Sequence, residues 1–252
     1  MPWISRINKA LAGQDGYSLK LATQPIVTIN PRLDEKPVFY EVLLRLVSPD
    51  GTITSAGEFI DSIALDNGLM ERVDWFVLKA TAELIAKTNH TYAANLGAAI
   101  LRSPYFIQSL SNMLRSKNAT VGKLALEVTE REQLHSQELD NLRLLVHNHL
   151  ILLDDVGAVA SRHSLFAYMG MDFVSGVKLD RNLISQVGTS WRHERIVANM
   201  FSLCADLDHI CICECVEDEP TMTILKRLAH PFPSLKLYLQ GYAISRPHLL
   251  ED

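Results

Sequence analysis

Side chains that carry oxygen or positive charge recur in this chain in or just after short apolar runs. They are Glu41, Asn95, Glu127, the pair Asp154 and Asp155, Lys178, Glu214 and Gln240. Burying a polar group beside an apolar strand costs free energy unless that group finds a partner. The spacing therefore predicts that the ends of several strands converge on one polar site.

The residue types indicate a site for divalent cations. Clustered carboxylates repel one another, and the repulsion raises their pKa values unless positive charge compensates it. Oxygen ligands without histidine or cysteine favour Mg²⁺ or Mn²⁺ over Zn²⁺. Asp154 and Asp155 are placed to serve two metals about 3.5–4 Å apart, an arrangement that promotes displacement at phosphorus. Lys178 adds a cation for developing charge, and Arg45 offers a forked donor to a phosphate.

Each of these residues also has an ordinary structural explanation. Glu41 alone is consistent with an ion pair, Asn95 with a helix cap and Gln240 with a strand end. The sequence DDVG at 154–157 is typical of a turn. Independent explanations would have to coincide at seven strand ends, so a single site is the favoured interpretation. The nine histidines are scattered, and none is assigned to the site.

Alternating strand and helix patterns position these residues. Apolar alternation predicts a strand at 19–29 and another around Glu41, and the short link between them indicates an antiparallel hairpin. Segment 48–59 is expected to be a loop with a helix starting near Ser55, and Pro104 is expected in a first helical turn. Helical spacing is found at 58–69, 69–88, 98–116, 137–149, 191–207 and 219–229. The predicted fold is α/β, a TIM-type (β/α)8 barrel modified by one antiparallel strand near the N-terminus.

Bulk composition limits the classes of protein. The chain has 252 residues, of which 48% are apolar, and a barrel of this type needs about 250 residues. The net charge of −5 argues against binding a nucleic acid polymer, although a small anion is compatible with metal ions at the site. No apolar stretch approaches the roughly 20 residues that cross a bilayer, and no signal peptide opens the chain. A cytoplasmic domain without direct membrane insertion is therefore expected.

Three of the four cysteines alternate along one apolar run. They are Cys211, Cys213 and Cys215, and Cys204 precedes them. In a strand the three would share one face. A soft-metal site would need further ligands at suitable spacing, and the sequence offers none. We predict small buried thiols that pack a strand against helices in a reducing compartment.

The ordered motifs resemble those of the EAL domain family, from Gln24 to Pro247. The naming motif reads EVLLR at 41–45, with Val42 in place of alanine. It is followed by ANLG at 94–97, LEVTE at 126–130, DDVG at 154–157, KLD at 178–180, ECVE at 214–217 and QGY at 240–242. The family comprises cyclic-di-GMP phosphodiesterases and degenerate relatives that act as receptors.

The resemblance implies a barrel that binds cyclic di-GMP at its C-terminal mouth and linearises it to pGpG with two Mg²⁺ or Mn²⁺ ions. The implied metal ligands are Glu41, Asn95, Glu127, Asp154 and Asp155. The implied catalytic residues are Glu41, Asp155, Lys178 and Glu214, and the implied substrate contacts are Gln24, Leu43, Arg45 and Gln240. The acids expected to support the metal ligands are Glu130, Asp180 and Glu217.

One segment departs from the family's pattern. Residues 156–165 read VGAVASRHSL, which is longer than usual and lacks the second glycine, the tyrosine and the serine pair. Three functions stay open: an active phosphodiesterase, a weak or inactive receptor that signals to a protein partner, and a protein-binding module without nucleotide. The complete ligand set favours the enzyme, and segment 156–165 with Val42 favours the receptor. The third function predicts loss of Arg45 or of the acids, and all are present.

The resemblance also implies a larger context. Residues 1–16 are expected to be a connecting segment before an EAL-type barrel domain at 17–252. Such domains are commonly attached to sensory or diguanylate-cyclase-like (GGDEF-type) modules, so we expect a longer protein, in which this domain is cytoplasmic even if the whole is membrane-tethered. Whether the domain forms a homodimer stays open, because the segment that commonly supports dimerisation, 156–165, is the one that departs from the family's pattern.

Overall fold

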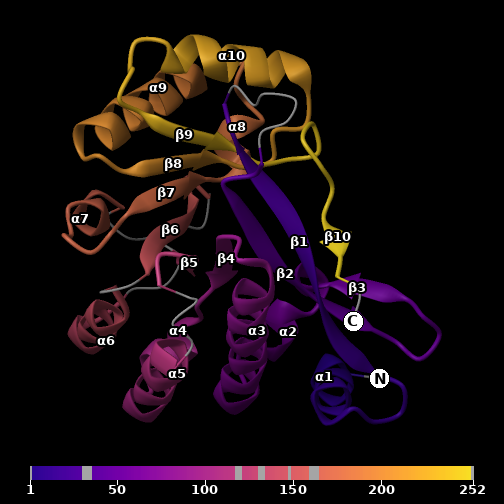
Figure 1. Cartoon of the computed structure of the whole chain (residues 1–252). Helices are drawn as coiled ribbons and strands as arrows, with labels where there is room; N and C mark the ends of the chain where they lie inside the picture. The colour runs from indigo at the N-terminus through magenta and orange to yellow at the C-terminus, as the bar shows by residue number, and fades with distance from the viewer. Residues whose placement is uncertain are drawn as a thin grey trace.

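The computed structural model describes residues 2–29, 36–116, 121–129, 134–146, 149–158 and 165–250, without the side chains of 98, 99 and 146. Its strands belong to one sheet (Figure 1). They are β1 (Ser18–Thr28), β2 (Phe39–Val47), β3 (Ile53–Ser55), β4 (Tyr92–Asn95), β5 (Leu124–Thr129), β6 (Leu150–Val156), β7 (Gly176–Leu179), β8 (Ile210–Cys213), β9 (Lys236–Leu239) and β10 (His248–Leu249).

Eight of these strands close into a barrel. Strands β2, β4, β5, β6, β7, β8 and β9 pair in parallel in that order. Strand β1 runs antiparallel to both ends of the series and closes the ring through β2 and β9. The predicted barrel with one antiparallel strand near the N-terminus is confirmed. Strands β3 and β10 add short antiparallel pairings to β2 and β1.

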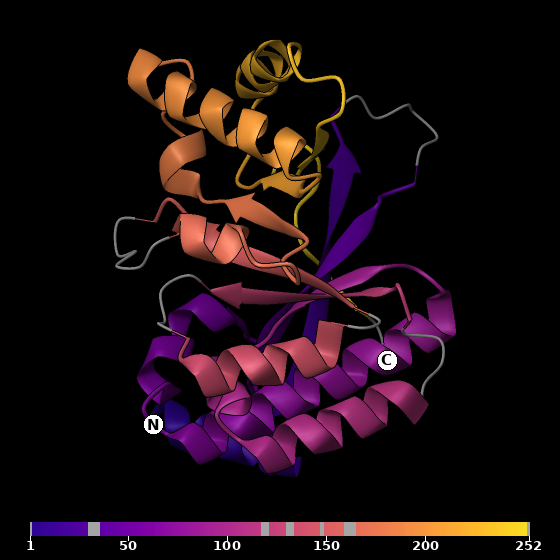
Figure 2. The same cartoon turned by 90° about the vertical axis from the view of Figure 1, so that its left-hand side faces the viewer.

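Helices cover the outside of the barrel. In Figures 1 and 2, α9 and α10 lie together over one part of the ring, and α3, α5 and α6 lie side by side along another. The helices are α1 (Trp3–Ala12), the 3-10 helix η1 (Ala56–Glu58), α2 (Ile60–Ile63), α3 (Asn67–Thr88), α4 (Ala98–Leu101), α5 (Pro104–Ser116), α6 (Ser136–Val146), α7 (Leu165–Met169), α8 (Arg181–Ile184), α9 (Trp191–Asp206) and α10 (Glu219–Ala229). No described helix is both long and apolar enough to cross a membrane.

Local chemistry explains where the helices differ from the predicted ranges. The Asp66 carboxylate accepts the backbone N–H of Leu69 at 3.0 Å, so it caps α3 and ends the predicted helix 58–69 early. Pro104 begins α5 as predicted, but it also splits the predicted helix 98–116, because the residue before a proline avoids helical conformation. The expected loop 48–59 contains β3, and η1 begins directly after Ser55.

Apolar side chains fill the lower interior of the barrel, at the N-terminal ends of its parallel strands. This interior layer consists of Ile26, Phe39, Ala93, Ala125, Leu152, Ile210 and Ile212. A larger cluster lies between the ring and the helices, and α1 contributes Ile7 and Ala10 to it. The layer closes this end of the interior, so the polar side chains inside the barrel lie towards the opposite, C-terminal mouth.

The cysteines follow the predicted packing with one exception. Cys204, Cys211 and Cys213 are free thiols buried between α9 and β8, as predicted. Cys215 lies beyond the end of β8, has a left-handed backbone conformation (φ 51°) and is half-buried. The prediction that it shares the packing of the other three is wrong, because the backbone leaves the strand before reaching it.

Candidate active site

Polar residues reach the barrel interior by the alternation of the strands. On β2, Phe39 belongs to the interior layer, and Glu41, two residues later, faces the same interior nearer the mouth. On the antiparallel β1 the order is reversed, so Gln24 precedes the interior residue Ile26. The same alternation on the other barrel strands gives Asn95, Glu127, Asp154, Lys178, Glu214 and Gln240. All eight strands therefore contribute to one ring of polar side chains, here called the polar ring.

A bulge at the end of β6 allows two adjacent aspartates to serve the ring. The register between β6 and β7 shifts between Leu153 and Val156. Asp155, inside the shifted segment, has a left-handed backbone with φ 58°. Simple alternation would send Asp154 and Asp155 to opposite faces, but here their carboxylates and that of Glu214 offer oxygens within 4.8 Å of one another.

The ammonium group of Lys178 lies at the centre of the polar ring and is fully buried. Its Nζ contacts four carboxylates from four strand ends, at 3.3 Å from Glu41, 2.9 Å from Glu127, 3.1 Å from Asp154 and 2.8 Å from Glu214. Burying an ammonium group without a partner is strongly destabilising, and these four contacts compensate its charge. Lys178 therefore ties the carboxylates of the ring together.

Burial and mutual charge shift the pKa values in the ring. Burial alone would lower the pKa of Lys178, but the surrounding carboxylates outweigh it and raise that pKa well above its ordinary value. Burial raises the pKa of Glu127 well above its usual range, although Lys178 opposes the shift. Burial likewise raises the pKa of Glu214 to about 8. The ring therefore holds more negative charge than a single lysine neutralises.

Amide side chains fix the orientation of Glu41. Nε2 of Gln240 donates hydrogen bonds to Oε2 of Glu41 and, at 3.0 Å, to Oε1 of Gln24. Gln24 in turn donates from its Nε2 to the backbone carbonyl of Ser245 at 2.9 Å. Gln24 and Glu41 are also opposite each other in the β1–β2 pairing. This network leaves Oε1 of Glu41 directed to Lys178.

The donor set of the ring fits hard divalent cations. Among the described residues, both carboxylate oxygens of Glu127 and Oδ1 of Asp154 are buried without a hydrogen-bond donor, although both side chains lie within ion-pair distance of Lys178. Asp155 adds a further carboxylate, and Asn95 lies beside Glu127 in the β4–β5 register. Oxygen donors with surplus negative charge are the ligands that Mg²⁺ and Mn²⁺ prefer.

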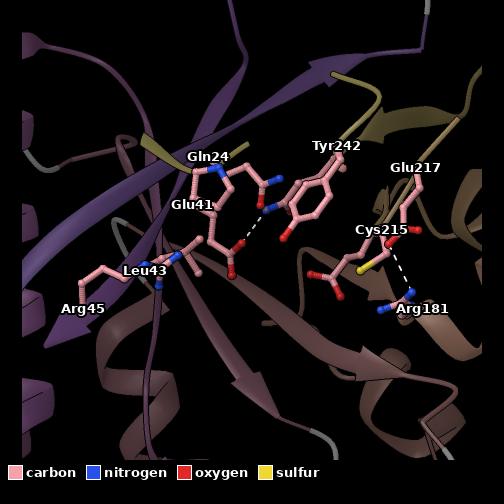
Figure 3. A pocket seen from close by; sticks show the side chains of 12 residues that line it. Gln24, Glu41, Leu43, Arg45, Arg181, Cys215, Glu217 and Tyr242 are labelled. Atoms are coloured by element: carbon pink, nitrogen blue, oxygen red, sulfur yellow. Dashed lines mark hydrogen bonds and ion pairs between the residues drawn. The ribbon is translucent and has the colours of Figure 1, made fainter. Parts of the chain in front are cut away.

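A cavity of about 290 Å³ opens above one side of the ring (Figure 3). In that view Leu43 and Arg45 lie on one side of the cavity, Arg181, Cys215 and Glu217 lie on the other, and Tyr242 lies between them. The predicted substrate contacts Gln24, Leu43, Arg45 and Gln240 all line this cavity. Arg45 also donates from Nη1 to the carbonyl of Leu44 at 2.8 Å.

The predicted supporting acids have different positions. Asp180 caps α8 by accepting the backbone N–H of Asn182 at 2.8 Å, and it does not line the cavity. Glu217 lines the cavity and pairs with Arg181 at 3.3 Å. Glu130 lies outside the described residues, as do residues 159–164 of the segment that departs from the family's pattern.

Several cavity residues were not predicted. They are Arg181, Cys215, Gly241, Tyr242 and Pro247. Cys215 lies inside the motif ECVE, and Gly241 and Tyr242 lie inside QGY, so position within a motif was the available signal. Pro247 is the last residue of the stretch that resembles the family. Arg181 directly follows KLD, and its placement depends on the short helix α8, which the periodicity does not reveal.

Comparison with known proteins gives one family match. A family model described as the EAL domain matches residues 5–247. The probable cyclic di-GMP phosphodiesterase PdeN of Escherichia coli (strain K12) is 27% identical over 223 residues, which cover 84% of this chain and 40% of that protein. The signaling protein YkoW of Bacillus subtilis (strain 168) is also 27% identical, over 82% of this chain and 26% of that protein. The chain thus spans less than half the length of these relatives.

Solved structures share the fold. The PaMucR phosphodiesterase in complex with c-di-GMP has a TM-score of 0.82 at 25% identity, over 98% of each chain. The EAL domain of FimX from Pseudomonas aeruginosa, bound to c-di-GMP, has a TM-score of 0.79 at 19% identity, over 98% of this chain and 97% of that one. These superpositions cover the whole barrel and agree with the predicted modified TIM-type architecture.

Proposed function

The chain belongs to the EAL domain family, and from this membership we propose that it hydrolyses cyclic di-GMP to linear pGpG with the help of divalent cations. The observation that carries the proposal is the completeness of the polar ring. Four carboxylates surround the ammonium of Lys178, and the carboxylate of Asp155 and the amide of Asn95 lie at neighbouring strand ends. Relatives of the chain are named as probable cyclic di-GMP phosphodiesterases.

The proposed metal ligands are Glu41, Asn95, Glu127, Asp154 and Asp155. Two bound Mg²⁺ or Mn²⁺ ions would activate water and neutralise charge on the phosphodiester. Lys178 keeps its proton, because the carboxylates raise its pKa. Once cations take up Glu41, Glu127 and Asp154, its Nζ would be free to donate a hydrogen bond to the oxygen that attacks phosphorus. Glu214, 2.8 Å from that ammonium, holds it in place on the side of the cavity.

The proposed substrate site is the cavity beside the ring. The guanidinium groups of Arg45 and Arg181 flank the cavity and suit the two negatively charged phosphodiesters of the ligand. Leu43 and Tyr242 provide apolar and aromatic surface for a base. A cavity of this size encloses only part of a cyclic dinucleotide, so the rest of the ligand extends over the rim.

The test is turnover by the purified chain. Wild type is incubated with cyclic di-GMP and Mn²⁺ or Mg²⁺, and pGpG is separated by chromatography. We expect Glu41→Gln to lower the rate by at least about 100-fold, because the neutral amide keeps the shape of the side chain and removes a metal-binding charge. A matched control is Glu194→Gln, which removes a surface ion pair with Arg227 and should leave turnover unchanged.

A receptor is the second candidate. The observations that favour it are the altered sequence at 156–165, directly after the two aspartates of β6, and Val42 beside Glu41. A shift of about 1 Å in the position of a metal ligand lowers the rate of hydrolysis by about 100-fold without abolishing the binding of the nucleotide. Tight binding of cyclic di-GMP measured by calorimetry, with no pGpG under either metal, would contradict the enzyme and support the receptor.

A further inference from the structure

A buried carboxylate outside the polar ring lies behind the strand end that carries Asn95. Asp74 is on the buried face of α3 and is 8% exposed. Its carboxylate accepts a hydrogen bond from the backbone N–H of Gly97, two residues after Asn95. Within the described part of the chain, Oδ2 of Asp74 has no hydrogen-bond partner. An apolar residue would fill this place at lower cost, so the carboxylate has a role other than packing.

The turn after β4 is built around this contact. A Cβ at position 97 would collide with Oδ2 of Asp74, so glycine is required for the close approach. The N–H of Leu96 donates to the carbonyl of Glu127 at 2.8 Å, and the carbonyl of Gly97 accepts the N–H of Ile100 at 3.1 Å. Asp74 binds the remaining N–H of Gly97, and together these bonds fix the path from β4 into α4.

The side chain of Asn95 depends on that path. It lies exposed at the rim of the ring, and no described residue makes a hydrogen bond to it. Its backbone therefore sets the point from which the amide reaches the ring, and the turn at Gly97 holds that backbone. Metal ligands must be positioned to within about 0.5 Å, so a loosened turn weakens the site without removing a ligand.

We propose that Asp74 is a positioning residue that, through the turn at Gly97, fixes the backbone from which the Asn95 amide enters the polar ring. The inference rests on the proposed function, in which this amide binds a divalent cation. Asp74 influences the ring through the backbone of Gly97, so removal of its carboxylate should lower the affinity of the ring for the metal.

The test measures Mn²⁺ binding by calorimetry together with the melting temperature. Asp74→Ala should raise the Kd for Mn²⁺ by about tenfold or more, as loss of groups that orient metal ligands does. Asp74→Asn keeps an acceptor oxygen and should restore the Kd to within about threefold. The matched control is Thr81→Val. Thr81 is also buried on α3, but its hydroxyl bonds to the carbonyl of Val77 in the same helix.

A second variant keeps the test decisive if Asp74→Ala does not fold. Gly97→Ala retains the carboxylate but displaces it, and it should also weaken Mn²⁺ binding by about tenfold. An unchanged Kd in folded Asp74→Ala and in Gly97→Ala would overturn the positioning role, as would a loss that Thr81→Val reproduces at equal melting temperature. Wild type that binds Mn²⁺ yet makes no pGpG would overturn the proposed function alone.

Discussion

At the scale of single residues, Asp74 makes stability depend on pH. Burial raises its pKa to about 7, whereas an aspartate in an unfolded chain titrates near 4. The folded state therefore binds the proton more tightly, and stability is lost as pH rises from about 4 to about 7. The side chain at position 74 cannot ionise in Asp74→Asn, so this variant should not lose that stability. Its free energy of unfolding relative to that of wild type should therefore rise across this interval, by up to about 4 kcal/mol.

Urea denaturation in EDTA at pH 5 and pH 8 checks this prediction. Other titrating groups are common to both proteins and cancel in the difference between wild type and Asp74→Asn. Thr81→Val should follow the wild-type pH profile, because its change on α3 introduces and removes no charge. Parallel profiles for Asp74→Asn and wild type would mean that the Asp74 carboxyl titrates at its ordinary pKa.

At the scale of elements, the bulge at the end of β6 lowers the stability of the fold and brings two adjacent carboxylates to the proposed metal site. Its left-handed residue is Asp155, in a conformation that glycine adopts without strain and that costs other residues about 1–2 kcal/mol. Asp155→Gly should therefore relieve the backbone strain at this position while weakening Mn²⁺ binding. Urea denaturation in EDTA and calorimetry measure the two effects. Asp155→Asn, which keeps the side-chain size, should weaken metal binding with little gain in stability.

The helices and strands also show which features of the site can be predicted from sequence patterns. Alternation fixes which strand residues face the interior, so the positions of Glu41 and Glu127 in the ring followed from the sequence. Alternation carries no information about backbone dihedrals, so the left-handed conformation of Asp155 did not follow from it. The contact between Asp74 and Gly97 joins a helix to a turn 23 positions later, and such a contact leaves no periodic signal.

At the scale of the whole molecule, the closed barrel holds surplus negative charge at one mouth. Burial raises the pKa of Glu214 to about 8 and that of Glu127 well above its usual range. Without metal, these carboxyl groups keep their protons in the folded state, so the stability they contribute falls as pH rises from about 4.5 towards 8. The metal-free molecule is therefore least stabilised by these groups at high pH, where bound cations would contribute most to its stability.

Divalent cations should reverse that loss. Metal ligands must be deprotonated to bind, so the affinity for Mn²⁺ rises with pH. We expect Mn²⁺ to raise the free energy of unfolding by about 2.7 kcal/mol at 100 times its Kd, and a fixed Mn²⁺ concentration to stabilise wild type more at pH 8 than at pH 6. Unfolding in Mn²⁺ against EDTA measures the difference, and Glu41→Gln should reduce it because the ring loses one carboxylate. An Mn²⁺ effect of equal size at both pH values would show that the cation does not bind through these buried acids.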